Sequence, residues 1–257
     1  MAEAIVRGLS RRGHIPLDRV IVADVSPERR QIFQIQLQVK AVEDISQVAR
    51  SNILLLSVKP QQMPLVLGGL RSVLNPETLI ISIAAGVRTR FIEETLGPSQ
   101  SWRVVRAMPN TPMRFGEGAT AVCPGAHATD RDMTEAQQIF EAAGVVVHTH
   151  EDKMDAITAV SGSGPAYIFY LVEQMIQAAI QMGISQQDAH LMATRTALGA
   201  ARMLVESNSS PAALRRQVTS PGGTTQAALT SLDNAKWPEL TISAIKAAAD
   251  RSKELSK

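Results

Sequence analysis

Residues 53–60 read Ile-Leu-Leu-Leu-Ser-Val-Lys-Pro, a short apolar run that stops at a lysine and a proline. A run with no polar alternation is typical of a β-strand that is covered on both faces. A proline in the first helical turn favours the start of a helix directly afterwards. We therefore predict a buried strand at Ile53–Val58, followed by a helix at Gln61–Leu74.

The same alternation continues on both sides of this segment. Further strands are predicted at Val20–Ala23, Leu79–Ile83, Arg103–Met108, Ala119–Cys123 and Val145–Thr149, with helices at Pro27–Val39, Thr89–Leu96 and Asp130–Ala143. Strands that alternate with helices indicate a mostly parallel sheet with helices on both faces. The predicted fold class is therefore α/β, with a Rossmann-like, doubly wound nucleotide-binding domain at residues 1–150.

The sequence pattern changes near Glu151, after which β-type runs disappear. Long helical segments rich in Ala, Met, Leu and Gln follow at Met154–Met182, Gln186–Val205, Pro211–Val218, Thr224–Asn234 and Glu239–Leu255. Residues 151–257 are therefore predicted to form an all-helical C-terminal domain. Its many small residues fit either an ordinary bundle core or a face that packs against a second copy of the chain.

Composition excludes several classes of protein. The 257 residues carry 26 Lys and Arg against 24 Asp and Glu, which argues against a nucleic-acid binder because phosphate binding needs a basic surplus. The lone Cys123 excludes an internal disulfide and a cysteine-based zinc cluster, and no compact pattern of metal ligands occurs. No apolar run approaches the ~18 residues of a membrane helix. We expect a cytoplasmic protein without a metal site.

The start of the chain is unusual for this fold. Met1–Arg12 is predicted to be a helix, whereas doubly wound domains open with a strand and a glycine-rich turn before that helix. The first strand lies centrally in such a sheet, so its omission would leave a gap and an unpaired edge. We expect that about a dozen residues, a strand and a glycine turn, precede this helix in the native protein. The alternative is a protein that lacks them.

Four further segments suggest ligand binding, each with a structural alternative. Ser57–Pro60 and Ser82–Gly86 end two predicted strands, where open α/β sheets bind ligands, although each is also an ordinary turn. Two prolines stiffen Met108–Pro112, which could present Asn110 to a ligand or simply connect elements. Ser161–Tyr167 brings Gly and Pro, which are unfavourable inside helices, into a helical pattern. Either close packing or the lining of a ligand crevice would account for them.

The glycine-rich segment Val218–Thr225 precedes a predicted helix. Its glycines expose backbone N–H groups, and these groups together with the helix dipole suit a small anion such as a carboxylate. The alternative is a helix N-cap formed by Thr224 or Thr225.

Taken together, these segments resemble pyrroline-5-carboxylate reductase, and the similarity extends over the whole chain. Val218–Thr225 continues through Ala228, Leu229, Leu232 and Asp233 in the pattern of the family's signature, and residues 1–5 match the end of its glycine-rich turn. The resemblance implies hydride transfer from NADPH or NADH to C5 of (S)-1-pyrroline-5-carboxylate, which gives L-proline in the last step of proline synthesis. An imine needs little activation once it is protonated, so the protein mainly has to orient it against the nicotinamide.

The resemblance also implies site residues. Thr225 is the implied catalytic residue, orienting the ring nitrogen. The implied substrate-binding residues are Glu151, Gln217, Ser220, Gly223, Thr224 and Thr225, with Gln217 in place of a common Asn. The implied cofactor-binding residues are Ser26, Asp44, Ser57, Val58, Lys59, Pro60, Ile83, Ala84, Ala85, Asn110 and Pro165.

The nucleotide preference is less clear from the residues. Asp24 suits a free ribose diol, whereas Arg29 and Arg30 suit a 2′-phosphate, so NADPH is slightly favoured and NADH stays open. The family further implies a homodimer through the helical domain, often assembled into a ring of dimers.

Two alternatives to this function remain at this stage. One is another two-domain imine or β-hydroxyacid reductase, although the catalytic Lys typical of the second class is missing between Met154 and Lys236. The other is a non-catalytic dinucleotide-binding protein that lacks the glycine turn.

Overall fold

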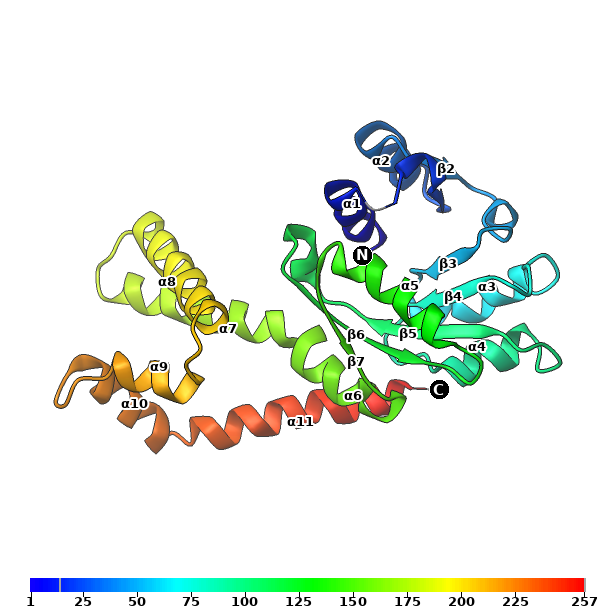
Figure 1. Cartoon of the computed structure of the whole chain (residues 1–257). Helices are drawn as coiled ribbons and strands as arrows, with labels where there is room; N and C mark the ends of the chain where they lie inside the picture. Colours follow the sequence, from blue (N-terminus) through cyan, green and yellow to red (C-terminus); the bar gives the residue numbers. More distant parts are fainter. Residues whose placement is uncertain (14, 257) are drawn as a thin grey trace. The chain divides into compact units, whose positions relative to one another are not determined.

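The computed structural model describes residues 1–13 and 15–256 (Figure 1). These residues form two compact units, which are described separately. Unit 1 contains Met1–Ser163 together with the C-terminal residues from Ala247 onward, and unit 2 contains Gly164–Lys246. The last helix, α11 (Trp237–Leu255), begins in unit 2 and ends in unit 1.

Unit 1 is built on a five-stranded sheet in the order β3-β4-β5-β6-β7. The strands β3, β4 and β5 run parallel, β5 and β6 are antiparallel, and β6 and β7 are parallel. The strands are β3 (Ile53–Leu56), β4 (Leu79–Ser82), β5 (Arg103–Met108), β6 (Gly118–Pro124) and β7 (Gly144–His148). The mostly parallel sheet and the α/β class predicted from the sequence are therefore confirmed.

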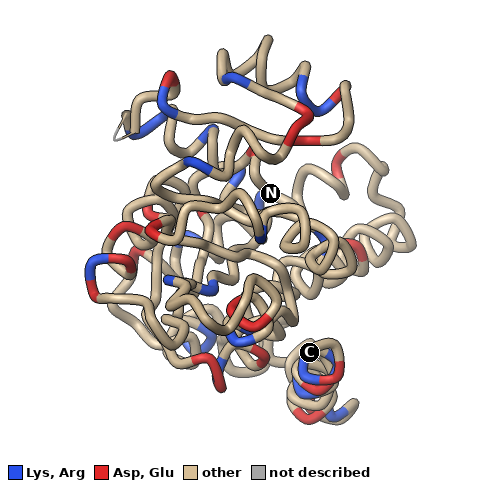
Figure 2. Tube along the Cα trace, turned by 90° about the vertical axis from the view of Figure 1, so that its right-hand side faces the viewer, with Lys and Arg blue, Asp and Glu red and all other residues tan. Residues whose placement is uncertain are grey.

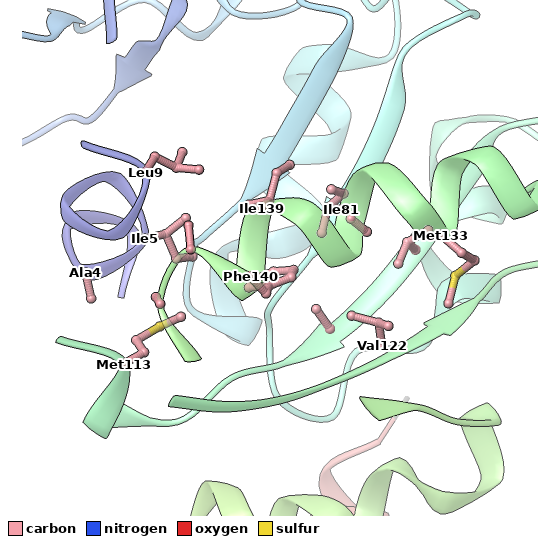
Figure 3. Close-up of a cluster of buried hydrophobic side chains, with 14 of the residues drawn as sticks. Ala4, Ile5, Leu9, Ile81, Met113, Val122, Met133, Ile139 and Phe140 are labelled. Carbon is pink, nitrogen blue, oxygen red and sulfur yellow. The ribbon is translucent and has the colours of Figure 1, made fainter. Parts of the chain in front are cut away.

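Helices cover both faces of this sheet. On one face, α1 (Ala2–Arg12) and α5 (Asp130–Glu141) pack their apolar sides on β4, β5 and β6, in a cluster that includes Ile5, Ile81 and Phe140 (Figure 3). On the other face lie α3 (Met63–Leu70) and α4 (Thr89–Leu96). Burial on both sides explains why β4 is buried at every position and why these strands lack polar alternation.

A second, two-stranded parallel sheet precedes the large one. It pairs β1 (Ile21–Ala23) with β2 (Lys40–Val42), and α2 (Pro27–Leu37) connects the two strands. Among the described residues no strand joins this sheet to β3, so the doubly wound sheet is interrupted at the expected place. The helix α1 packs on both sheets, with Ile5 in the core of the large sheet and Val6 against α2 and β2.

Short helical turns complete unit 1. They are η1 (Leu17–Arg19), η2 (Ile45–Gln47), η3 (Pro60–Gln62), η4 (Thr111–Phe115), η5 (Glu151–Lys153), α6 (Met154–Ile157) and the π-helical turn η6 (Thr158–Gly162). One feature of α5 is a complete capping box, in which Thr129 and Asp132 each accept a hydrogen bond from the other's backbone N–H. The buried Asp132 carboxylate also pairs with Arg103 at 2.9 Å, which anchors α5 to β5.

Unit 2 consists of helices only. They are α7 (Gly164–Gln181), α8 (Gln186–Glu206), α9 (Pro211–Gln217), α10 (Thr224–Asn234) and the first part of α11. Serines start two of these helices, since Ser185 caps α8 and Ser210 caps α9. Its described apolar side chains are mostly exposed, and only Ala189, Ala193 and Leu214 are buried.

Basic and acidic residues are interspersed along the chain, as the net charge of +2 leads one to expect (Figure 2). Among the helices of residues 1–13 and 15–256, none combines the length and apolar character that a membrane span requires.

Candidate active site

The predicted cofactor segments of unit 1 meet at one edge of the large sheet. Because β3 and β4 are parallel, Ser57, Val58, Lys59 and Pro60 follow one strand at the same edge where Ile83, Ala84 and Ala85 follow the next. The Ile83 N–H donates to the Leu56 carbonyl at 3.1 Å, which joins the two segments directly. This is the edge at which open α/β sheets bind nucleotides.

The segment after β4 carries two small side chains, Ala84 and Ala85, of which only the second is exposed. Ala85 is exposed, and Ala84 is buried with its N–H near the Ser82 hydroxyl at 3.4 Å. Lys59 is exposed and directly precedes Pro60, which begins η3. The two segments therefore offer backbone groups and one cation to a ligand at this edge.

Asn110 follows β5, the third parallel strand, and its side-chain amide links two segments. The Asn110 carbonyl oxygen accepts from the Ala119 N–H at 2.9 Å, and its amide donates to the Ser161 carbonyl at 3.1 Å. These contacts connect the start of β6 to the π-helical turn. The rigid connection that the sequence left open is present, and the prediction that Asn110 also contacts a cofactor stays a prediction.

Glu151 is held by the N-terminus of α4 and by a buried arginine. Its two carboxylate oxygens accept from the Thr89 N–H at 2.8 Å and the Thr89 hydroxyl at 3.0 Å, and Oε1 lies 3.4 Å from Nη1 of Arg106. Arg106 has a side-chain exposure of 2%, and its Nη2 has no hydrogen-bond partner among the described residues. Glu151 therefore stabilises the fold, whether or not it also binds substrate as predicted.

Sequence reasoning missed Arg106 and Thr89. The signal for Arg106 was present, since a charged residue stands between the apolar residues Val105 and Ala107 inside a strand. Nothing local pointed to Thr89, whose partner lies 62 residues away.

The same buried region contains the lone cysteine. Burial raises the pKa of the Cys123 thiol to about 12, and the nearby Glu151 carboxylate adds to this rise. The thiol is therefore protonated at neutral pH and is a poor nucleophile, and it packs with Ala121 and Met154 in a buried cluster.

Ser26 and Asp44 both lie just after strands of the small sheet. Ser26 caps α2 by accepting from the Arg29 N–H at 3.2 Å, and Asp44 caps η2 through the Ser46 N–H at 2.8 Å. Hydrogen bonds from the Ser46 hydroxyl and N–H lower the pKa of the exposed Asp44 carboxyl, so it carries a negative charge at neutral pH. The prediction that both residues contact the adenosine end of a dinucleotide stays a prediction.

The two arginines near Ser26 have partners already. Arg30 donates to the Asp24 carbonyl at 2.8 Å and pairs with Glu43 at 3.0 Å. Arg29 pairs with Glu3 at 3.1 Å and stacks over the Phe33 ring. The opposing charges that the sequence showed around this site are therefore present in the structure as well.

In unit 2, the glycine-rich segment leads into α10 as predicted. Gly223 is the N-cap of α10, and no side chain caps the helix, so the alternative of a Thr224 or Thr225 N-cap is wrong. Gly222 adopts φ +69°, and its N–H is taken by Gln226 at 2.6 Å. The N–H groups of the first turn point out of an uncapped helix start, where the dipole favours an anion.

The other predicted site residues of unit 2 lie on α7, on α9, in the segment before α10 and in the first turn of α10. Thr225 is half-buried in the first turn of α10, Gln217 is exposed at the end of α9, and Ser220 lies between them. Pro165 is the second residue of α7, where its missing N–H costs no helical hydrogen bond. The predicted site residues thus lie partly in unit 1 and partly in unit 2.

Among the described residues, no three His, Cys, Asp or Glu side chains gather closely enough to hold a metal ion.

Two family models match the chain. Residues 151–255 match the model of pyrroline-5-carboxylate reductase dimerisation, and residues 1–86 match the model of NADP oxidoreductase, coenzyme F420-dependent. A nicotinamide dinucleotide is thus the cofactor class of this protein.

Curated relatives match over the full length. The pyrroline-5-carboxylate reductase of Methanosarcina acetivorans is 38% identical over 100% of this chain and 95% of its own length. That of Pseudomonas aeruginosa is 39% identical over 100% of this chain and 93% of its own.

Solved structures agree with the sequence matches. A pyrroline-5-carboxylate reductase from Coxiella burnetii superposes with a TM-score of 0.91 at 39% identity, covering 100% of this chain and 95% of that one. The Plasmodium falciparum enzyme, solved with NADP bound, gives 0.88 at 27% identity, covering 99% and 94%. With such identity over its whole length, the chain belongs to the pyrroline-5-carboxylate reductase family.

Proposed function

We propose that the two groups of site residues divide the work of one reaction, the reduction of (S)-1-pyrroline-5-carboxylate to L-proline by NAD(P)H. The reaction itself follows from membership of the family. The residues after β3, β4 and β5 bind the dinucleotide in this proposal, and the segment before α10 binds the substrate. The observation that carries it is the uncapped start of α10, preceded by glycines and followed by two threonines.

The substrate carboxylate binds at the start of α10. Its negative charge matches the helix dipole, and the free N–H groups of Thr224 and Thr225 can donate to its oxygens. The left-handed Gly222 turns the backbone towards the helix and takes its own N–H out of competition by bonding Gln226. Ser220 and Gln217 border the same segment.

The Thr225 hydroxyl orients the imine nitrogen of the bound ring. A neutral hydroxyl is too weak an acid to protonate the ring fully, so its contribution is to hold C5 in the path of the hydride. The nicotinamide supplies the hydride, and the residues around Thr225 hold the ring in place through hydrogen bonds.

NADPH is the proposed coenzyme, with NADH as the second choice. A relative of the family has been solved with NADP bound, which supports this choice. Arg29 lies next to the Ser26 N-cap, and its side chain stays 38% exposed although it pairs with Glu3. Asp24 and Glu28 both hydrogen-bond Ser26, and their negative charges oppose a 2′-phosphate at this place. The test is a comparison of kcat/KM for the two coenzymes, in which a strong preference for NADH would overturn the choice.

The helical region is proposed to form a homodimer, which can assemble further into a ring of dimers. The match to a dimerisation model supports this. So does the surface of unit 2, where Phe169, Met182 and Leu240 are all more than half exposed. A groove of about 500 Å³ between α7 and α8 is lined by apolar residues such as Ile168 and Val172 together with polar ones such as His190. Water-exposed apolar area of this extent is typical of a face that is buried in an oligomer.

Two further parts of the proposal concern organisation. The boundary between a nucleotide-binding domain and a helical substrate-binding and dimerisation domain is placed at residue 151, where the dimerisation model begins to match. The proposed compartment is the cytoplasm, since a single cysteine is typical of a protein from a reducing compartment.

The experiment that tests the proposed site is the substitution Thr225→Ala. Loss of a hydrogen bond to a charged imine should lower kcat/KM by about 10- to 100-fold. Thr225→Ser keeps a hydroxyl and should restore most of the rate. Thr230→Ala, on an exposed position of the same helix, is the matched control. Unchanged kinetics in Thr225→Ala would refute the role of this residue.

A further inference from the structure

The segment proposed to bind the dinucleotide after β4 is in contact with the C-terminal end of the chain. Gly86 directly follows Ile83–Ala85 and adopts φ +73°, a conformation that favours glycine. A Cβ at this position would lie 3.1 Å from the Leu255 carbonyl oxygen and 3.4 Å from the Ser256 nitrogen. The backbone after β4 therefore packs directly on the backbone at the end of α11.

A carboxylate fixes this end of α11 to unit 1. Oδ1 of Asp155, in α6, accepts from the Ser252 hydroxyl at 2.7 Å and lies 3.0 Å from the Ser256 hydroxyl. Ser252 is buried, and the contacts link residues that are 97 and 101 positions apart. The Ser256 hydroxyl also lies 2.9 Å from the Ser252 carbonyl, so it shares its one hydrogen between two acceptors. These bonds hold the last turn in place beside Gly86.

We propose that Asp155, acting through the turn Ser252–Ser256, is a positioning residue for dinucleotide binding. The turn supports the backbone of Gly86 and so keeps Ile83–Ala85 in one conformation before the dinucleotide arrives. A loop that is ordered in advance binds more tightly, because its ordering entropy is not lost on binding. This inference rests on the proposed cofactor role of Ile83–Ala85.

The physical consequence is specific to one ligand. Without the Asp155 bonds, the turn and the loop sample more conformations, and dinucleotide binding has to select the competent one. The dissociation constant for the dinucleotide then rises by the inverse of the competent fraction. The substrate segment before α10 is distant in sequence, and among the described residues it shares no hydrogen bond with Asp155. The KM for the imine and kcat should therefore stay close to those of the unaltered protein.

The experiment measures NADPH binding to the full-length protein by fluorescence titration, together with steady-state kinetics. Asp155→Ala, which removes the acceptor of two hydroxyls, should raise the NADPH dissociation constant by about tenfold. Asp155→Asn retains an acceptor oxygen and should return it to within about twofold. Asp250→Ala removes an exposed carboxylate earlier in the same helix, outside the turn, and is the matched control.

A second variant keeps the test decisive if Asp155→Ala folds poorly. The double substitution Ser252→Ala and Ser256→Ala removes the donors and leaves the carboxylate to water, and the same rise in the dissociation constant is expected. Unchanged NADPH binding in a folded variant of either kind would overturn the proposal, as would an equal rise in the KM of the imine.

Failure of the cofactor assignment itself is recognised separately. Ala85→Glu places a carboxylate in the proposed dinucleotide segment at an exposed position. If Ala85→Glu weakens NADPH binding and the Asp155 variants do not, the positioning role is wrong and the cofactor segment stands. If Ala85→Glu also binds NADPH normally, the assignment of Ile83–Ala85 is wrong.

Discussion

Glu151 provides the sharpest test of how the structure is stabilised, because its carboxylate has two separate tasks. It accepts the N–H of Thr89, at the start of a helix whose N-cap residue, Arg88, provides no side-chain bond, and it is the acidic partner of the buried Arg106. Removal of one member of a buried pair costs about 3–5 kcal/mol. Loss of a cap adds about 1 kcal/mol. The Glu151 side chain is 27% exposed, so water compensates part of the loss.

We therefore expect Glu151→Ala to lower the free energy of unfolding by about 3 kcal/mol. For a chain of this size that corresponds to a thermal midpoint lower by about 6–12 °C. Arg106→Met should cost less, about 1 kcal/mol. In this variant Glu151 keeps its hydrogen bonds with Thr89 and can be hydrated, whereas Glu151→Ala leaves the buried guanidinium of Arg106 unpaired and out of reach of water. The double variant Arg106→Met with Glu151→Gln should be less destabilised than the sum of its two single substitutions, with a coupling energy of about 1–2 kcal/mol.

The assay is thermal and chemical denaturation at a fixed protein concentration, since oligomerisation shifts the apparent stability. Glu94→Ala is the matched control, because it breaks an exposed pair with Arg90 on the same helix and should change stability by less than about 0.5 kcal/mol. If Glu151→Ala kept its full stability and only raised the KM of the imine, the structural role would be refuted and substrate binding would be its function.

Three other outcomes are expected. Because burial raises the pKa of Cys123 to about 12, a thiol reagent at pH 8 should label the folded protein slowly and the unfolded protein fast, and fast labelling of the native state would contradict the buried thiol. Phe169→Glu should shift the mass in sedimentation equilibrium towards the monomer, whereas Leu65→Glu, exposed on α3, should leave it unchanged. Gly222→Ala should raise the KM of the imine several-fold, while Gly183→Ala, at another positive φ, strains the chain without that effect.

The elements that the sequence predicted well have strong local patterns. Ile53–Leu56 and Leu79–Ser82 are apolar runs, and α4 matches its predicted bounds, Thr89–Leu96, at both ends. The strand Lys40–Val42 was missed, because three residues with one buried alanine show no period. Its existence depends on pairing with β1, which is a tertiary contact.

The site was predictable in part for the same reason. Strand ends and glycine-rich turns are local features, so the sequence predicts where the strands before Ser57–Pro60 and Ile83–Ala85 end and where α10 starts. The contacts of Glu151 with Thr89 and of Asp155 with Ser252 join residues 62 and 97 positions apart, and no local pattern encodes them. The π-helical turn is similar, because glycine and serine signalled an interruption but the bond from Asn110 to Ser161 was not visible.

A product balance with the purified protein, (S)-1-pyrroline-5-carboxylate and either coenzyme tests the proposed reaction at its centre. One L-proline should form for each NADPH or NADH oxidised, and Thr225→Ala should strongly reduce that turnover. Coenzyme that stays reduced in the presence of the imine, for both nucleotides, would contradict it.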